Sequence, residues 1–285
     1  METSVAAICA LGKRARASKT SRRQARPEGE LSDQNDCGES LAEICEAAAA
    51  LILPLWKSGV EVLTKADESP VTEADQRGEK LILEHLARRF PGVPVISEED
   101  ASEFGTPDAI GPRFFLVDPL DGTKAFVRGD PNFTVNVALV VDGRAVAGAV
   151  TAPPTGETWF TQGGAAMKRV NGGPAVPVRV RPWPQGKAVA LVSHTMKEET
   201  AVKLANEYGF DLREPMDSSI KFCRIAEGSA DVYPRHGPTM EWDIAAGHAV
   251  LEAAGGTVLT PEGQPVRYGK AGDGFRNGWF VARGG

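Results

Sequence analysis

Four short acidic segments contain the residue types in this chain that are best suited to chemistry. They are 69–75, 96–100, 116–123 and 241–247, and each ends a predicted strand or begins a predicted helix. Carboxylate oxygens are the ligands that Mg²⁺, Mn²⁺ and Ca²⁺ prefer over nitrogen and sulfur. The four segments therefore indicate a divalent cation site built from residues that are distant in the sequence.

The segment 116–123 is the most informative, because it places two aspartates on either side of a turn. The apolar run 114–117 is typical of a buried strand, and Pro119 fixes φ and forces the chain to turn after Asp118. Asp121 then returns beside Asp118, with the Leu120 carbonyl between them. This arrangement offers three hard oxygens to one small cation.

Gly122 and Thr123, which follow the two aspartates, suit a bound phosphate. Glycine lets the backbone approach a ligand closely, and Thr123 can begin a short helix whose free N–H groups face an anion. Two carboxylates this close repel each other unless a cation neutralises them. The alternative interpretation is an Asx turn that only follows a strand.

Each of the other acidic segments also has a purely structural interpretation. Glu98, Glu99 and Asp100 could form a solvated loop after a strand. Asp75 and Asp243 could cap helices, because carboxylates accept bonds from free N–H groups and favour the positive end of the helix dipole. All four segments together, in this order, favour a metal site over four separate structural roles.

The elements that must position these acids can be predicted from apolar spacing. Helices are predicted over 41–58 (ended by Gly59), 74–90, 198–208, 219–227 and 243–254, and strands over 93–96, 113–117, 133–141, 145–150, 188–192, 230–233 and 256–259. Asp142-Gly143 is a hairpin turn signal between two of these strands. An antiparallel first half and an alternating second half predict a layered α+β/α/β architecture.

Composition excludes several classes of protein. The 285 residues are 42% hydrophobic and 25% charged, which is typical of a globular chain. No apolar run reaches the roughly 18 residues that a membrane-spanning helix needs. The net charge of −6 argues against a dedicated nucleic-acid binder. The four cysteines show no CxxC spacing, so we expect free thiols in a reducing compartment.

Residues 1–36 differ in composition from the rest of the chain. Seven basic residues and no acid lie between Lys13 and Arg26. This composition superficially suggests an organelle transit peptide, whereas low hydrophobicity and clustered like charge favour a disordered extension. We expect a disordered basic segment over 1–36, an α+β lobe with most metal ligands over 37–180, and an α/β lobe with the last metal ligand and the specificity residues over 181–285.

These motifs resemble those of the inositol monophosphatase superfamily of magnesium-dependent, lithium-sensitive phosphatases. The matching residues are Asp75, Glu98-Glu99, 118–123 and 242–246. Within that superfamily, the runs 121–126, 132–136, 218–223 and 226–235 resemble the CysQ-type 3'(2'),5'-bisphosphate nucleotidases. The resemblance implies the superfamily's sandwich of alternating αβαβα layers. It also implies removal of the 3'-phosphate of adenosine 3',5'-bisphosphate to give AMP, and action on the sulfated analogue of sulfate assimilation.

The resemblance also implies the cofactors and the roles of the site residues. It implies two to three Mg²⁺ ions, with Mn²⁺ as a substitute and Li⁺ and Ca²⁺ as inhibitors. The implied metal ligands are Glu98, Asp118, the Leu120 carbonyl, Asp121 and Asp243. An activated water would attack phosphorus directly, without a phosphoenzyme, and Thr123, backed by Asp75 or Glu98, would take its proton. The implied substrate contacts are Glu98, Leu120, Asp121, Gly122, Thr123, His194, Ser218, Lys221, Arg235 and Asp243.

Lys221 is the candidate for specificity, because an ammonium near a second, 5' phosphate would favour a bisphosphate. The alternative is a surface lysine on a helix. Arg235 is a similar candidate, and His194 and His236 could contact a base or have only structural roles.

Other functions remain open at this stage. One is an inositol or sugar phosphatase of the same superfamily. Another is a catalytically weak binding protein whose basic tail contacts anionic lipid or RNA. We expect a cytoplasmic monomer or homodimer with a small-molecule nucleotide substrate and no nucleic-acid partner. Peripheral contact with the inner face of the cell membrane is left open.

Overall fold

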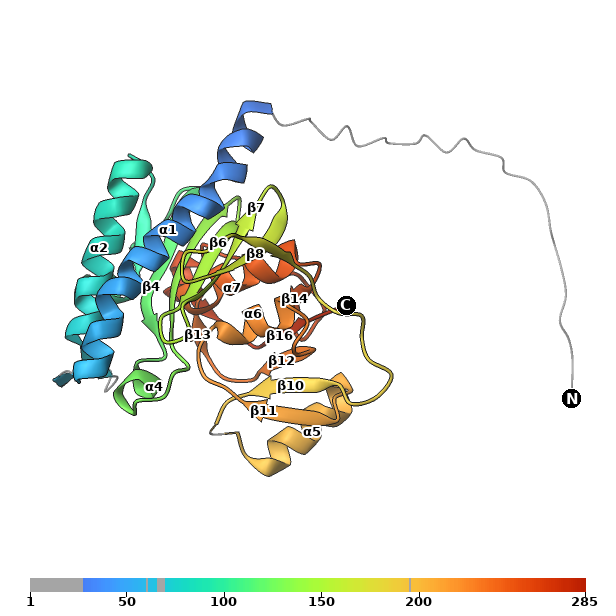
Figure 1. The fold of residues 1–285 in the computed structure, drawn as a ribbon. Helices are drawn as coiled ribbons and strands as arrows, with labels where there is room; N and C mark the ends of the chain where they lie inside the picture. Colours follow the sequence, from blue (N-terminus) through green and yellow to red (C-terminus); the bar gives the residue numbers. More distant parts are fainter. Residues whose placement is uncertain (1–27, 60, 66–69, 195) are drawn as a thin grey trace, which may run out of the picture.

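The computed structural model describes residues 28–59, 61–65, 70–194 and 196–285. Two large β-sheets form the frame of this part of the chain (Figure 1). The larger sheet has seven strands in the order β3 (Val95–Ser97), β4 (Arg113–Asp121), β5 (Thr134–Val141), β6 (Arg144–Ala152), β7 (Glu157–Gln162), β8 (Ala165–Val170) and β9 (Val176–Val178). Strand β3 runs parallel to β4, and the other neighbouring pairs are antiparallel.

The smaller sheet belongs to the second half of the chain. Its five strands, in spatial order, are β11 (Leu212–Pro215), β10 (Val189–Val192), β12 (Val232–Arg235), β16 (Phe280–Arg283) and β14 (Thr257–Leu259). Strand β10 is parallel to both neighbours, and β16 is antiparallel to both of its own. Two shorter pairs join β1 (Val62–Thr64) to β2 (Pro70–Thr72) and β13 (Thr239–Met240) to β15 (Arg276–Asn277).

Helices cover the sheets in three layers (Figure 1). One face of the larger sheet packs against α1 (Glu28–Ser58) and α2 (Glu73–Arg89). Between the two sheets lie α6 (Ile220–Ala226) and α7 (Glu241–Ala253). The outer face of the smaller sheet packs against α5 (Glu198–Tyr208). The order is therefore α-β-α-β-α, which confirms the expected layered sandwich. The short helices are α3 (Glu98–Phe104), α4 (Thr123–Val127) and the 3₁₀ turn η1 (Ala271–Asp273).

The middle helix α7 packs unusually close to the larger sheet. A Cβ placed on Gly148 of β6 would lie 2.6 Å from the Ala246 carbonyl oxygen and 3.1 Å from the Ala249 Cβ. A glycine opposite alanines is therefore what lets the backbones of strand and helix approach each other. The same helix carries Asp243 in its first turn.

Most of the predicted elements are present, but helix α1 begins earlier than predicted and several strands were not predicted. Helix α5 has the predicted bounds, and Asp142 and Gly143 turn β5 into β6 with φ values of 51° and 73°. However, α1 begins at Glu28, so residues 28–36, which we expected to be disordered, are helical. Residues 1–27 lie outside the described part. The strands that were not predicted are β1, β2, β7, β8, β9, β11, β13, β15 and β16.

The described cysteines are free thiols, as predicted from their spacing. Cys37, Cys45 and Cys223 are free and buried, and burial raises the pKa of each thiol. Cys9 lies outside the described residues. Among those residues, none of the helices is both long and apolar enough to cross a membrane.

Candidate active site

The aspartates of the central motif lie on an irregular end of β4. Asp118 pairs with Asn136 and Asp121 pairs with Thr134, with a shift of register between them. The strand therefore continues to Asp121 through a bulge, whereas we predicted that it would end before Asp118. The Leu120 N–H donates to Asp118 Oδ1 at 3.0 Å, so an Asx turn is also present. The bulge places two acids close together on one strand end.

Gly122 and Thr123 form the turn from this strand into α4, as predicted. Gly122 has a φ of 99°, and a Cβ there would lie 3.0 Å from the Asn132 carbonyl oxygen, so only glycine fits without strain. Thr123 begins α4. Its hydroxyl lies 3.2 Å from both Asp75 Oδ1 and the Leu120 carbonyl oxygen. Thr123 is thus linked to Asp75 rather than to Glu98.

Asp75 combines a capping role with its place in the site. It is the third residue of α2, and its Oδ2 accepts bonds from the Thr72 N–H (2.8 Å) and the Thr72 hydroxyl (2.6 Å). The side chain is 1% exposed, and burial raises its pKa to about 6 despite the bonds from Thr72, which oppose the rise. A carboxylate with this pKa can accept a proton near neutral pH. The other oxygen, Oδ1, faces Thr123.

Glu98 begins a helix rather than a solvated loop. It is the first residue of α3, and it shares the ammonium of Lys65 with Glu99, each at 2.8 Å. Burial raises the pKa of Glu99 to about 7. The two free N–H groups of Glu99 and Asp100 donate to the buried carboxylate of Glu79 at 2.9 Å. The position of Glu98 is thus fixed by a salt bridge from one side and a helix cap from another.

Asp243 joins the other acids from the far end of the chain. It is the third residue of α7, and its Oδ2 accepts a bond from the Met240 N–H at 2.8 Å. Burial, and then the charge of Asp121, raise its pKa well above the ordinary value. Burial and the charges of Glu98, Asp121 and Asp243 raise the pKa of Asp118 in the same way. These acids are therefore close enough to repel one another.

The repulsion among these acids fits a cation, although the side chains are not grouped as ligands. Glu98, Asp118, Asp121 and Asp243 offer only oxygen donors, and like charge contributes to the raised pKa of three of them. In the described part of the chain, no group of three or more His, Cys, Asp or Glu side chains is arranged to hold a metal ion. Glu98 instead bonds to Lys65. Donor type and charge therefore fit a divalent ion, and the assignment of individual ligands remains a prediction.

A cleft of about 860 Å³ brings together most of the residues predicted for the site. The predicted residues that line it are Glu98, Asp121, Gly122, Thr123, His194, Ser218, Lys221, Arg235 and Asp243. Asp75, Asp118 and Leu120 lie behind this lining and reach it through Thr123 and the bulge. The cleft thus contains both acids, such as Asp121 and Asp243, and cations, such as Lys221 and Arg235.

Lys221 is buried, so the alternative interpretation of a surface lysine is wrong. It is 4% exposed, and its ammonium donates to the carbonyl oxygens of Met216 (3.2 Å) and Ser218 (2.5 Å). The ammonium also lies 4.8 Å from the centre of the Tyr233 ring. Burial lowers the pKa of Lys221 to about 8, although the charge of Asp121 opposes this.

Arg235 and the histidines occupy different parts of the surface. Arg235 donates to the Pro238 carbonyl oxygen at 3.2 Å, while its buried Nε has no hydrogen-bond partner among the described residues. His194 lies 3.3 Å from Asp217 at the cleft. His236 does not line the cleft. It stacks on the exposed Trp279, with ring centres 4.7 Å apart.

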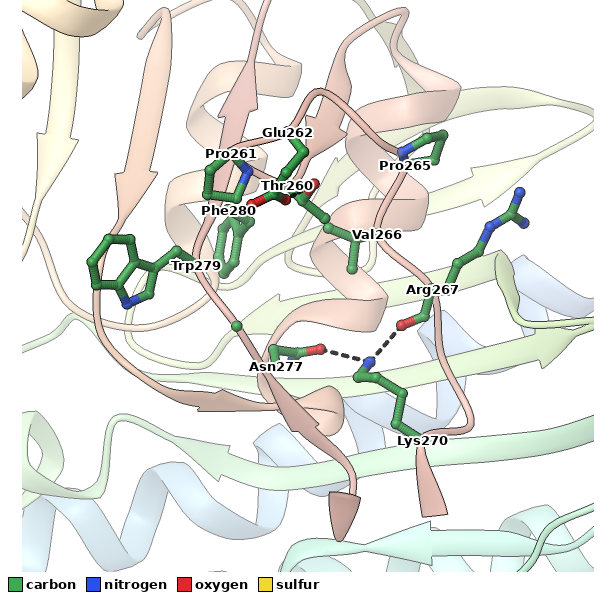
Figure 2. A pocket seen from close by; sticks show the side chains of 11 residues that line it. Thr260, Pro261, Glu262, Pro265, Val266, Arg267, Lys270, Asn277, Trp279 and Phe280 are labelled. Carbon is green, nitrogen blue, oxygen red and sulfur yellow. Dashed lines mark hydrogen bonds between the residues drawn. The ribbon is translucent and has the colours of Figure 1, made fainter. Parts of the chain in front are cut away.

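A second hollow, of about 580 Å³, lies beside Trp279 and shares no lining residue with the cleft (Figure 2). Its lysine, Lys270, already donates to the Arg267 carbonyl oxygen and to Asn277, as the dashed lines in Figure 2 show. Lys270 also pairs with the buried Glu241 at 2.6 Å. This hollow therefore brings together none of the predicted site residues.

Several residues of the site were not predicted from the sequence. Glu79 lies four residues after Asp75, so helical spacing places both carboxylates on one face of α2 and could have identified it. Lys65 gave no signal, because nothing in the sequence connects it to Glu98. Arg128 and Asp217, which form an ion pair at 2.8 Å in the cleft lining, gave none either.

Comparison with known proteins agrees with this fold and with these motifs. A model of the inositol monophosphatase family matches residues 35–278. The chain is 38% identical over 232 residues to the 3'(2'),5'-bisphosphate nucleotidase CysQ of Salmonella typhimurium, which covers 81% of this chain and 93% of that protein. It is 34% identical to the CysQ of Buchnera aphidicola over 81% of this chain and 86% of that one.

Solved structures show the same fold. The crystal structure of CysQ from Bacteroides thetaiotaomicron superposes with a TM-score of 0.72 at 32% identity, covering 88% of this chain and 97% of that one. An inositol monophosphatase from Anabaena superposes with a TM-score of 0.67 at 21% identity, covering 89% and 92% of the two chains, and shows the fold alone. These matches confirm the resemblance to CysQ-type proteins and the expectation of an enzyme. The chain belongs to the inositol monophosphatase family.

Proposed function

We propose that this enzyme is a 3'(2'),5'-bisphosphate nucleotidase that hydrolyses the 3'-phosphate of adenosine 3',5'-bisphosphate to AMP, and also acts on the sulfated analogue. One observation carries the proposal: a single cleft joins the acids Asp121 and Asp243 to the cations Lys221 and Arg235. The acids suit a metal-assisted phosphate hydrolysis, and the cations suit a second anionic group. The CysQ relatives, which are nucleotidases by name, support the same substrate class.

The metal sites are part of the proposal. Glu98, Asp118, the Leu120 carbonyl, Asp121 and Asp243 would hold two Mg²⁺ ions, with Asp75 near a third. When bound, such ions lower the pKa of a water and neutralise charge on the phosphate and on the leaving oxygen. Glu98 contacts Lys65 through Oε1, so its other carboxylate oxygen would be the one to bind a cation.

The chain's own residues would orient the phosphate and move one proton. The N–H groups at Gly122 and Thr123 begin α4 and would bind the phosphate oxygens. The Thr123 hydroxyl would accept the proton of the attacking water as it donates its own to Asp75 Oδ1, 3.2 Å away. The raised pKa of Asp75, about 6, makes this carboxylate a better proton acceptor than an ordinary aspartate.

Lys221 and Arg235 are the proposed partners of the second phosphate. Both line the cleft, and each lies close enough to Asp121 for their charges to influence its pKa. Within the described part of the chain the Nε of Arg235 has no hydrogen-bond partner, so this guanidinium retains a donor. The Lys221 ammonium donates two hydrogen bonds to carbonyl oxygens. Because an ammonium has three N–H donors, one remains for a phosphate oxygen.

The test compares initial rates on adenosine 3',5'-bisphosphate, 3'-AMP and inositol 1-phosphate, with and without Mg²⁺. We expect the bisphosphate to have the highest kcat/KM and no turnover in EDTA. Lys221→Ala should raise KM for the bisphosphate by about tenfold to a hundredfold, and for 3'-AMP far less, because a charge-assisted contact with phosphate is worth about 1.5–3 kcal/mol. A preference for inositol 1-phosphate would replace the proposal with an inositol monophosphatase.

Inhibition by lithium provides a second measurement. From the resemblance to lithium-sensitive phosphatases we expect Li⁺, and also Ca²⁺, to inhibit by occupying one of the proposed Mg²⁺ sites, and Mn²⁺ to support turnover. Rates measured in LiCl against matched NaCl check this expectation. Equal rates in the two salts at every concentration would argue against the proposed metal sites.

A further inference from the structure

Asp217 joins two residues that belong to different parts of the fold. One carboxylate oxygen pairs with Arg128 Nη2 at 2.8 Å, at the end of α4, and the other lies 3.3 Å from His194 Nδ1, just after β10. All three residues line the cleft that contains the acids. The side chains of Arg128 and His194 are 52% and 40% exposed, so both are accessible to a molecule entering the cleft.

The loop that carries Asp217 is held firmly in place. The carbonyl oxygens of the residues on either side of it, Met216 and Ser218, both accept bonds from the Lys221 ammonium. The Met216 N–H donates to the Val192 carbonyl oxygen at 2.8 Å, which ties the loop to β10. Ser218 adopts a φ of 57°, which a residue other than glycine seldom adopts unless its surroundings hold it there. Asp217 therefore has little freedom to move away from the cleft.

A fixed acid at this place changes what Arg128 and His194 offer to a ligand. We propose that Asp217 is a specificity-determining residue: Arg128 and His194 would contact the non-scissile phosphate in addition to Lys221 and Arg235, and Asp217 competes with that phosphate for them. This inference rests on the proposed function. In the free enzyme, the guanidinium of Arg128 pairs with Asp217 at 2.8 Å and lies 3.9 Å from Asp130. Because Asp217 is held in place, an entering phosphate must draw the exposed Arg128 side chain away from it. Asp217 therefore weakens the binding of the second phosphate and does not affect the binding of uncharged groups.

The size of the effect follows from the exposure of the pair. Exposed ion pairs are weak because water and salt screen them, so replacing Asp217 with a neutral residue of the same shape should change affinity by about two- to fivefold. Removing Arg128 should abolish most of that change, because Asp217 would then have lost its main partner. The two residues should therefore not act additively.

The experiment is a calorimetric titration of the full-length protein with AMP, which carries only the non-scissile phosphate, and with adenosine, which carries none. Asp217→Asn should tighten AMP binding by about two- to fivefold and leave adenosine binding unchanged. In an Arg128→Gln background the same substitution should have a smaller effect. Glu198→Gln is the matched control, because Glu198 pairs with Arg213 outside the cleft and its loss changes net charge equally.

Three results would overturn the inference: AMP binding that is unchanged or weaker in Asp217→Asn, an equal change for adenosine, or the same gain in Glu198→Gln. An equal change for adenosine would place Asp217 against the base instead. The titration does not depend on turnover. Failure to hydrolyse adenosine 3',5'-bisphosphate in the rate assay would thus refute the proposed function separately.

Discussion

Replacing Asp121 with asparagine should stabilise the metal-free protein while it abolishes activity. The pKa of Asp121 rises from 3.8 to about 6, first because of burial and also because of the nearby charge of Glu98. A rise of about two pKa units corresponds to about 3 kcal/mol at pH 7, at about 1.4 kcal/mol per unit. Asp121 retains some contact with the cleft, so screening by water makes this figure an upper limit.

The sign of the pH dependence follows from the direction of that pKa change. Between about pH 4 and pH 6 the folded state binds more protons at Asp121 than the unfolded state does, so the free energy of unfolding falls as the pH rises. Below pH 4 the carboxyl is protonated in both states and carries no penalty. Asparagine has no charge to lose, and its carbonyl oxygen can still accept the bond from the Ser219 N–H. The increase in the free energy of unfolding caused by Asp121→Asn should therefore appear above pH 6 and disappear near pH 4.

The assay is thermal unfolding followed by circular dichroism, in EDTA and in Mg²⁺, at pH 4 and at pH 7.5. In EDTA at pH 7.5, Asp121→Asn should melt up to about 10 °C above the original protein, since about 1 kcal/mol shifts Tm by about 2–4 °C in chains of this size. Mg²⁺ should raise the Tm of the original protein more than that of the variant. A lower Tm for the variant at pH 7.5 in EDTA would refute the idea that these acids repel one another.

Three further predictions follow from other residues. Glu79→Gln should lower Tm and raise the Mg²⁺ concentration needed for half-maximal activity, because it weakens the cap that holds α3 and Glu98; an unchanged Mg²⁺ titration would contradict this. Gly148→Ala should lower the free energy of unfolding by about 1–3 kcal/mol, measured in urea, whereas Gly111→Ala, with open space around it, should be close to neutral. Deletion of residues 1–27 should leave Tm and kinetics unchanged, and a loss of activity at low salt would show a role for the basic segment.

The sequence could predict the parts of the site that depend on local patterns. Pro119 lies between Asp118 and Asp121, Gly122 turns the chain with a positive φ, and Thr123 begins a helix. Each of these features follows from the residue type and its immediate neighbours in the sequence. Local patterns also predicted elements of the layered fold. The apolar residues of α5 recur at helical spacing, and the β5–β6 hairpin has a strong turn signal. The resemblance to a known family indicated how the four acidic motifs are grouped in one site.

The rest depends on contacts between distant residues, which no local pattern encodes. The sequence left open whether Lys221 is a specificity residue or a surface lysine, because its burial depends on the carbonyl oxygens of Met216 and Ser218, which accept bonds from its ammonium. The bulge at β4 appears only when its register with β5 is known. The helical residues 28–36 were missed because their polar composition outweighed the helix that continues from Cys37 onward.

The position of α7 between the two sheets has a consequence for how the enzyme acquires activity. Asp243 comes from this helix, more than a hundred residues after Asp121, and α7 contacts β5 and β6 on one side and β14 on the other. Contacts of such long sequence separation form late and slowly in folding, because the intervening chain must first be ordered. During refolding, secondary structure should therefore recover well before catalysis. A proteolytic fragment that ends before Glu241 would contain the other acids and still be inactive.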